Sequence, residues 1–234
     1  MEEQKNVSKT NVKKRSQIRS ILNRYKKNRL AMVGLILLAI LILLAIFAPV
    51  FANYEQDAIK QNIKDRFQTP SFGKHIFGTD QYGRAVFARV IFGSRISLSI
   101  GLATVVIALT IGVLIGSIAG YYGGRIDNII MRVMDVFLAI PEMLMAISIV
   151  AALGPGVQNL LIAMVISNVP RFSRIVRSSI LSIKDQEFVE AAKACGANDT
   201  RIILKYIIPN AIGPIIVQAT LSIAGIIIAI SGLS

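Results

Sequence analysis

The sequence has few of the residues that build covalent, metal or catalytic sites. Its 234 residues include one cysteine, one histidine and no tryptophan. Cys195 alone cannot form a disulfide within the chain or a cysteine-based metal site. His75 has no cysteine or carboxylate cluster beside it in the sequence, so we expect no bound metal.

Two catalytic signatures are also missing from the sequence. It has no GxxxxGK[ST] loop for binding nucleotide phosphates. It has no Ser/His/Asp set for nucleophilic catalysis either. We therefore expect this chain to carry neither a catalytic residue nor a cofactor.

Acidic residues are scarce, since 13 Asp and Glu stand against 26 Lys and Arg, for a net charge of +13. The basic residues lie in stretches between apolar runs rather than along one face, which argues against nucleic-acid binding. Hydrophobic residues make up 54% of the chain and the mean hydropathy is +0.62. One soluble core of this size could not bury so much apolar surface. The composition predicts a polytopic membrane protein.

Five apolar stretches approach or exceed the roughly 20 residues that a helix needs to cross a bilayer. They are residues 30–52, 96–124, 129–153, 154–170 and 207–233. The first run is longer than the apolar region of a cleavable signal, and no small-residue cleavage site follows it. The last run reaches almost to residue 234.

The distribution of basic residues predicts the topology. Ten of them lie in residues 1–29, so the positive-inside rule makes this segment a basic cytoplasmic tail. Counting spans from there places residues 53–95 outside the cell membrane and residues 171–205, with seven basic residues, inside. The outer segment also has seven basic residues against four acids, but we expect the stronger amino-terminal bias to decide the orientation.

A charged segment at about residues 180–210 predicts a short helix that ends sharply. Ser182 and Asp185 have the spacing of a capping box that opens a helix. The alanines that follow favour a helix with a thin surface, which a partner could approach closely. Gly196 can end the helix in the left-handed conformation.

A second helix is expected after Gly196. Asn198 and Asp199 are alternative N-caps for it. Its apolar residues recur at helical spacing until Pro209 interrupts the pattern. The whole segment is predicted to be two helices around a tight turn that form a docking surface.

The segment resembles the EAA loop of ABC importer permeases. The resemblance rests on Glu190-Ala191-Ala192, Gly196 and Pro209, while Tyr206 and Ile208 replace the family's usual histidine and leucine. It implies that the loop faces the cytoplasm and that its first helix docks in a cleft of a separate ATPase subunit. The residues that it marks for ATPase coupling are Glu190, Ala191, Ala192, Gly196, Asp199 and Pro209.

A second block, residues 77–98, resembles the segment before the second helix in a permease of oligopeptide, dipeptide and nickel importers. Ala85 replaces the aspartate usual there, so the block lacks one acid that could pair with a nearby arginine. Glycines, among them Gly93, divide the block into short pieces, and its apolar residues recur at helical spacing. We expect an interfacial helix within residues 53–95, with a solvated connecting loop as the alternative.

These resemblances imply an all-α, type I ABC importer-like transmembrane domain, with the permease core at residues 96–234. Permeases of this type usually have a sixth span, so the resemblance implies one beyond the five expected here. The chain would form a translocation path for di- and oligopeptides in the cell membrane, as a heterodimer with a second homologous permease. Two cytoplasmic ATPase subunits would bind ATP and Mg, and an extracytoplasmic substrate-binding protein would deliver the cargo. A nickel or metal-chelate cargo is the alternative. An ion-coupled secondary transporter and a structural membrane scaffold are rival classes, but neither explains the EAA segment.

Two acids interrupt the third apolar stretch, and ionisable groups inside a membrane usually face protein or a watery cavity. Asp135 lies three residues after Arg132, so we expect a structural or gate-lining ion pair between them. Glu142 follows Pro141 and has no cation nearby in the sequence. It is either a pathway-lining group or a buried carboxyl that is neutral or hydrogen-bonded.

Glycines and alanines also recur along the second stretch. Gly112 and Gly116 form a GxxxG motif within this seam of small residues. Such motifs let two helix backbones approach closely in a membrane. We expect the seam to be a helix-packing surface.

Overall fold

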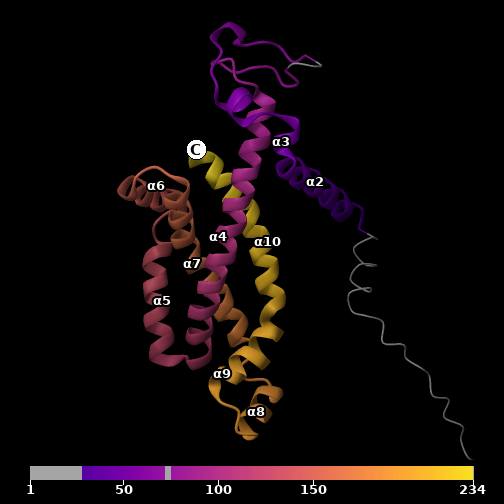
Figure 1. Cartoon of the computed structure of the whole chain (residues 1–234). Helices are drawn as coiled ribbons and strands as arrows, with labels where there is room; N and C mark the ends of the chain where they lie inside the picture. Colours follow the sequence, from indigo (N-terminus) through magenta and orange to yellow (C-terminus); the bar gives the residue numbers. More distant parts are fainter. Residues whose placement is uncertain (1–27, 72–74, 234) are drawn as a thin grey trace, which may run out of the picture. The chain divides into compact units, whose positions relative to one another are not determined.

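The computed structural model describes residues 28–71 and 75–233, and the predicted basic tail lies almost entirely outside them. Within the described residues every regular element is a helix, and the only β-structure is two isolated β-bridges in a loop. The all-α fold class is thus confirmed. The chain divides after Ser94 into two compact units, which we describe in turn (Figure 1).

The first apolar stretch forms two helices, α2 (Arg29–Ile46) and α3 (Ala48–Phe51), rather than one. The side chain of Asn28 caps α2 by accepting a hydrogen bond from the Ala31 N–H. Pro49 lies in the first turn of α3, where a backbone without an N–H leaves no helical hydrogen bond unmade. Phe47 therefore follows the end of α2, and a new helix begins at Ala48.

The rest of the first unit is a loop that folds onto the start of α4 (Val86–Tyr122). It contains a π-helical turn, η1 (Tyr54–Ile59), and a 3-10 turn, η2 (Ile63–Asp65). A small apolar cluster joins α3, η1 and the first turns of α4 through Ala48, Ala58, Ala88, Ile91 and Phe92.

The helix expected within residues 53–95 is not separate from the second span, because residues 86–95 are the first turns of α4 itself. Its place at the membrane interface stays a prediction. Gly93 does not break the helix. A single interior glycine costs only about 1 kcal/mol relative to alanine, which the packing of Ala88, Ile91 and Phe92 can offset. Gly78 and Gly83, with φ of +73° and +74°, do form turns in the preceding loop.

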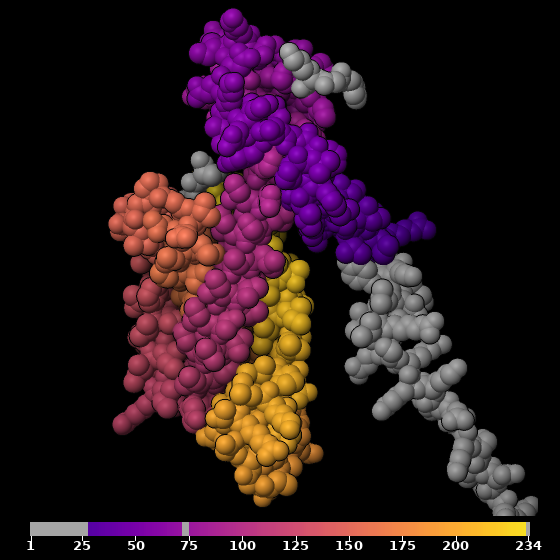
Figure 2. Space-filling view, viewed as in Figure 1, coloured from indigo at the N-terminus to yellow at the C-terminus, as the bar shows by residue number. Residues whose placement is uncertain are grey.

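The second unit contains the remaining helices. They are α5 (Gly124–Leu138), α6 (Glu142–Leu153), α7 (Val157–Leu181), α8 (Glu187–Ala194), α9 (Asp199–Ile202), the π-helical η3 (Ile203–Ile207) and α10 (Ile208–Leu233). Figure 1 shows α4, α7 and α10 running side by side, with α5 and α6 against α7. In the space-filling view of Figure 2, α8 and α9 form one end of this unit.

The small residues of α4 pack against the backbone of α7, as the sequence predicted. A Cβ atom added to Gly112 would lie 2.6 Å from the Cβ of Phe172, and one added to Gly116 would lie 2.5 Å from the carbonyl oxygen of Ser173. Side chains at these positions would force the two helices apart.

The third apolar stretch is not one straight span. α5 and α6 are bent by 82° at a short break, where Pro141 follows Ile140. Proline disfavours the helical conformation of the residue before it and cannot donate a backbone hydrogen bond. The pair is therefore a broken span or a re-entrant loop.

Among the described residues, three helices are long and apolar enough to cross a membrane, or four if the bent pair counts as one span. The predicted fourth span, residues 154–170, has a different end in the structure. α7 does not stop at Pro170 but continues through three arginines to Leu181. The segment from residue 171 to 181, predicted to be a cytoplasmic loop, is therefore helical.

Candidate coupling site

α8 is the first helix of the EAA segment, and it starts later than predicted. Its N-cap is Gln186, whose side chain makes no capping hydrogen bond. The predicted capping box is wrong, because Ser182 is the C-cap of α7 and its hydroxyl donates to the Ser179 carbonyl at 2.8 Å. Ser182, which was expected to open α8, therefore belongs to the end of α7.

The two faces of α8 differ sharply. Val189 and Ala192 are buried and pack in a cluster with Val176 and Ile180 of α7. The opposite face has the helical spacing i, i+3, i+4, i+7 and is exposed; it consists of Glu187, Glu190, Ala191 and Ala194. Glu190 and Ala191 thus lie on an open surface, which we call the α8 outer face, whereas Ala192 supports it from within.

Gly196 closes α8 in the predicted left-handed conformation, with φ of +77°. Its N–H donates to the Lys193 carbonyl at 2.9 Å, and the Ala197 N–H donates to the Ala192 carbonyl at 3.1 Å. This pair of bonds defines a Schellman motif. Apart from its chain neighbours, no described residue has an atom within 4 Å of a Cβ built on Gly196, so a side chain here would meet backbone strain rather than a clash.

Asn198, not Asp199, caps the second helix. The Asn198 side chain accepts a hydrogen bond from the Arg201 N–H at 3.0 Å. Asp199 instead accepts a hydrogen bond of 2.7 Å from the Tyr121 hydroxyl at the end of α4. The Lys193 ammonium lies 5.6 Å from the centre of the same tyrosine ring, so Tyr121 contacts both α8 and α9.

Tyr121 is a positioning residue that our reading of the sequence missed. Its partners Lys193 and Asp199 are more than 70 residues away in the chain. Its only mark in the sequence is its place beside a second tyrosine at the end of an apolar run.

Pro209 does not end the second helix, contrary to the prediction. α9 passes through η3 directly into α10, and Pro209 is the second residue of α10. In η3 the Ile208 N–H donates to the carbonyl of Ile203, five residues earlier. This wider π-helical turn gives room for a proline ring that would otherwise clash with the carbonyl four residues before it.

Three arginines on α7 pair with acids on α5 and α6. Arg177 binds Asp127 through two nitrogens, with Nε donating to Oδ1 at 2.8 Å. Arg174 pairs with Asp135. Arg171 donates to Glu142 at 3.0 Å. The sequence spacing of these arginines, i, i+3 and i+6, places them along one side of α7.

The partner of Asp135 was predicted wrongly, since it is Arg174 on α7 and not Arg132 on its own helix. Asp135 and Arg132 both line an open depression of about 450 Å³ along α5. The Asp127–Arg177 pair is more buried, with 11% of the Asp127 side chain exposed. It was not singled out as a pair from the sequence.

Glu142 is a hydrogen-bonded carboxyl at the first residue of α6. Besides Arg171, its carboxylate accepts a hydrogen bond of 3.0 Å from the Asn168 side-chain amide. About a quarter of the side chain is exposed (27%). Asn168 is fully buried and its Oδ1 has no partner among the described residues. Whether Glu142 also lines a pathway stays a prediction.

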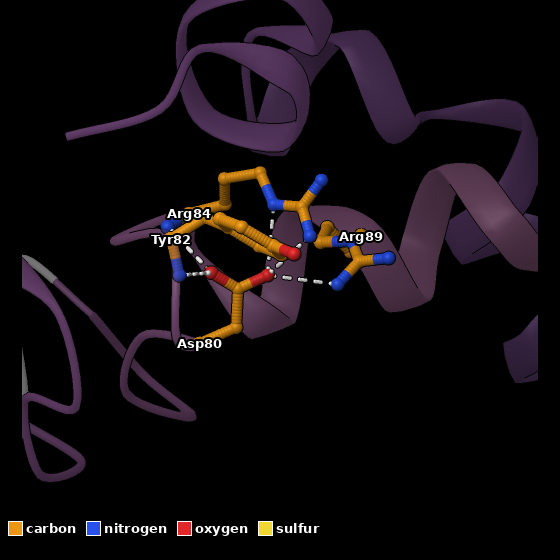
Figure 3. A network of polar contacts seen from close by, with 4 residues as sticks. All are labelled: Asp80, Tyr82, Arg84 and Arg89. Carbon is orange, nitrogen blue, oxygen red and sulfur yellow. Dashed lines mark hydrogen bonds and ion pairs between the residues drawn. The ribbon is translucent and has the colours of Figure 1, made fainter. Parts of the chain in front are cut away.

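A separate polar network lies in the first unit (Figure 3). The Oδ1 atom of Asp80 accepts the backbone N–H groups of Tyr82 and Arg84 at 2.9 and 3.0 Å. Its Oδ2 atom accepts Arg84 Nε and Arg89 Nη1, each at 2.8 Å. Asp80 thus pairs with both Arg84 and Arg89, the arginines near Ala85.

The hydrogen-bond donors around Asp80 stabilise its charged form. Burial raises the pKa of this carboxyl, but the backbone N–H groups of Arg84 and Tyr82 and the Arg84 guanidinium together outweigh that effect and lower it. The carboxylate is therefore ionised throughout the neutral range.

Comparisons with known proteins agree with the geometry. A sequence model described as "Binding-protein-dependent transport system inner membrane component" matches residues 112–234. A second, "N-terminal TM domain of oligopeptide transport permease C", matches residues 16–70.

Several curated proteins are similar over most of the chain. A dipeptide transport system permease protein of Alkalihalophilus pseudofirmus is 49% identical over 203 residues, covering 87% of this chain and 66% of that protein. An oligopeptide transport system permease protein of Bacillus subtilis is 44% identical, covering 86% and 65%. A putative peptide transport system permease protein of Brucella abortus is 41% identical, covering 90% and 70%. The chain spans about two thirds of the length of these relatives.

Proposed function

Because this chain belongs to the family of binding-protein-dependent transport system inner membrane components, we propose that it is a permease subunit of an ATP-driven importer for peptides. It forms the translocation path as a heterodimer with a second homologous permease. Two cytoplasmic ATPase subunits bind ATP and Mg, and an extracytoplasmic binding protein delivers the cargo. The names of the similar permeases, which refer to dipeptide, oligopeptide and peptide transport, support the choice of cargo.

The observation that carries this proposal is the α8 outer face. Glu190 and Ala191 are exposed on a helix whose other side is fixed in a buried cluster. The Schellman turn at Gly196 and the contacts of Tyr121 further restrict its motion. A short rigid helix whose open face has two acids and two small side chains suits docking in the cleft of another subunit.

Movement of α8 would pass directly to the rest of the unit. Only residues 182–186 separate α8 from α7. The arginines of α7 bind α5 and α6, and Tyr121 connects the end of α4 to Asp199. We propose that closure of the ATPases displaces α8 as a lever and that the helices rock between inward-open and outward-open states.

Asp135 and Glu142 belong to the path or its gate in this proposal. Their side chains are 47% and 27% exposed, and each faces an arginine. Charged groups within a membrane protein are costly against lipid and usually face protein or water. The side of α7 that carries Arg171 and Arg174 is therefore the one proposed to face the permeation route.

A nickel or metal-chelate cargo remains the alternative within the same role. An ion-coupled transporter is the rival class, and Glu142 beside Pro141 is its best support. The two classes differ in one measurement. Uptake into vesicles should require ATP and the ATPase subunits under the proposal, and an ion gradient alone under the rival.

The test of coupling uses Glu190→Ala and Gly196→Asp in the assembled transporter. Glu190 is placed to meet an arginine or a backbone donor of the ATPase, a charge-assisted contact worth about 1.5 to 3 kcal/mol when desolvated. A side chain at Gly196 would oppose the left-handed turn by roughly 1 kcal/mol. We expect both variants to reach the membrane with their partner permease, to lose ATPase subunits on purification and to abolish ATP-driven dipeptide uptake.

Thr200→Ala is the matched control, because Thr200 is exposed on α9 but lies outside the α8 outer face. It should retain ATPase association and uptake. If Glu190→Ala and Gly196→Asp also retain both, the assignment of α8 as the coupling helix is wrong.

A further inference from the structure

Two arginines in the first unit share a single carboxylate. Arg84 and Arg89 both donate to Oδ2 of Asp80, so the three side chains together carry a net charge of +1. Arg89 is half exposed (49%), and its other guanidinium nitrogens have no acceptor in the part of the chain that the structure describes. Figure 3 shows both guanidinium groups converging on the same side of Asp80. The cluster can therefore bind a second anion.

Aromatic side chains surround the helix turns beside this cluster. The ring of Tyr54 packs edge-on against Phe92, with centroids 5.0 Å apart, and Phe77 packs in the same way against Phe87. Tyr54, Phe77 and Tyr82 remain exposed on their other sides. Aromatic rings with arginine and lysine nearby are typical of the zone where a membrane protein crosses the lipid headgroups.

The length of α4 places these residues at that depth. Its 37 residues measure about 55 Å at 1.5 Å per residue, whereas the hydrocarbon core of a bilayer is about 30 Å thick. The uncharged part, residues 96–122, already exceeds that thickness at about 40 Å. The first ten residues of α4, which include Arg89, therefore project into the headgroup layer.

From these observations we infer that Arg84 and Arg89 bind the phosphate of an anionic phospholipid headgroup, while Tyr54 and Phe77 anchor the same loop among the lipids. A guanidinium pair suits a phosphate because it offers several parallel N–H donors. The inference requires only that α4 crosses a membrane. It does not depend on the cargo or on the coupling role of α8.

The absence of tryptophan from the chain gives a direct test. Phe77→Trp introduces a unique fluorophore that keeps an aromatic ring against Phe87. The full chain is reconstituted in vesicles of equal parts phosphatidylglycerol and phosphatidylcholine, with bromine near the top of the acyl chains of one lipid at a time. We expect bromine on phosphatidylglycerol to quench the tryptophan more strongly than bromine on phosphatidylcholine.

Variants in this background identify the residues responsible. Arg89→Gln leaves Arg84 on Asp80, and we expect it to weaken the association with phosphatidylglycerol by about fivefold, the effect of one basic residue near an anionic surface. Arg89→Lys should keep most of the preference. Asp80→Asn should strengthen it, because the amide still accepts backbone N–H groups but no longer neutralises an arginine. Arg66→Gln is the matched control, an exposed charge of the same loop, and should have little effect.

Several results would overturn the inference. Equal quenching by the two brominated lipids would show no headgroup preference, and an equal loss in Arg66→Gln would reduce it to general loop charge. Reversal by soluble glycerol phosphate at millimolar concentration would identify a site for free phosphate. An unchanged lipid preference in Arg89→Gln together with weaker capture of the binding protein would identify a protein as the occupant. Unchanged tryptophan emission in detergent shows that each variant keeps the loop fold.

Discussion

Glu142 illustrates how a single side chain can connect two helices. It begins α6 just after the bend from α5, and its two oxygens bind Asn168 and Arg171 on α7. Removing one partner of such a pair leaves the other charge without compensation, which costs more than the pair contributes when intact. The partial exposure of both side chains reduces that cost through solvent screening.

We expect Glu142→Gln to lower transport, because the amide can still bind Asn168 but leaves Arg171 without an anion. The exchange Glu142→Arg with Arg171→Glu should recover more activity than either single change, since it restores the pair with opposite polarity. ATP-driven dipeptide uptake, normalised to the amount of permease in the membrane, measures both effects. Normal uptake by Glu142→Gln would remove Glu142 from the functional residues.

At the scale of helices, the contact between α4 and α7 depends on the absence of side chains. A Cβ atom on Gly116 would meet the Ser173 carbonyl oxygen, the Val176 side chain and the Arg177 nitrogen within 3.0 Å. Two of these are backbone atoms that cannot rotate away. Without a hydrophobic force between helices in lipid, this close packing is a main source of their association.

Gly116→Ala should therefore destabilise the protein by about 1 to 3 kcal/mol, the usual cost of overpacking. Gly93→Ala is the matched control on the same helix, because outside the local helix backbone no described atom lies within 4 Å of the added methyl group. We expect it to stabilise α4 by about 0.5 to 1 kcal/mol. Loss of the monodisperse species on heating in detergent measures both changes, and equal stability of the two variants would contradict the packing argument.

The coupling segment was predictable where its structure is local. The left-handed turn at Gly196 and the cap at Asn198 depend on a few neighbouring residues. The sequence predicted the turn, and it narrowed the cap to Asn198 or Asp199. The ion pairs of α7 could not be predicted in this way. Asp127 and Arg177 are 50 residues apart, so only the packing of α5 on α7 brings them together.

The end of α7 shows a second limit. Pro170 indicated a helix terminus in the sequence, yet it lies inside α7 and is almost completely buried. Packing against neighbouring helices offsets the hydrogen bond that proline cannot make. The predicted start of α8 was wrong for the same reason. Ser182 was expected to open α8, but it is the C-cap of the longer α7.

For the whole molecule, the predicted orientation can be tested with cysteines in a Cys195→Ser background. Lys13→Cys and Lys184→Cys should resist an impermeant thiol reagent in intact cells, since both are predicted to lie in the cytoplasm. Asn62→Cys should react, since it lies in the segment predicted to be outside. Labelling of position 184 from outside would contradict the topology.

The three ion pairs of α7 constrain how the second unit can move. Arg174 and Arg177 connect α7 to α5, and Arg171 connects it to α6. A displacement of α7 from α5 must break two of these pairs, and a displacement from α6 must break the third. Each broken pair leaves a charge without its partner, which is costly inside a membrane protein. We therefore expect α5, α6 and α7 to travel together as a single body.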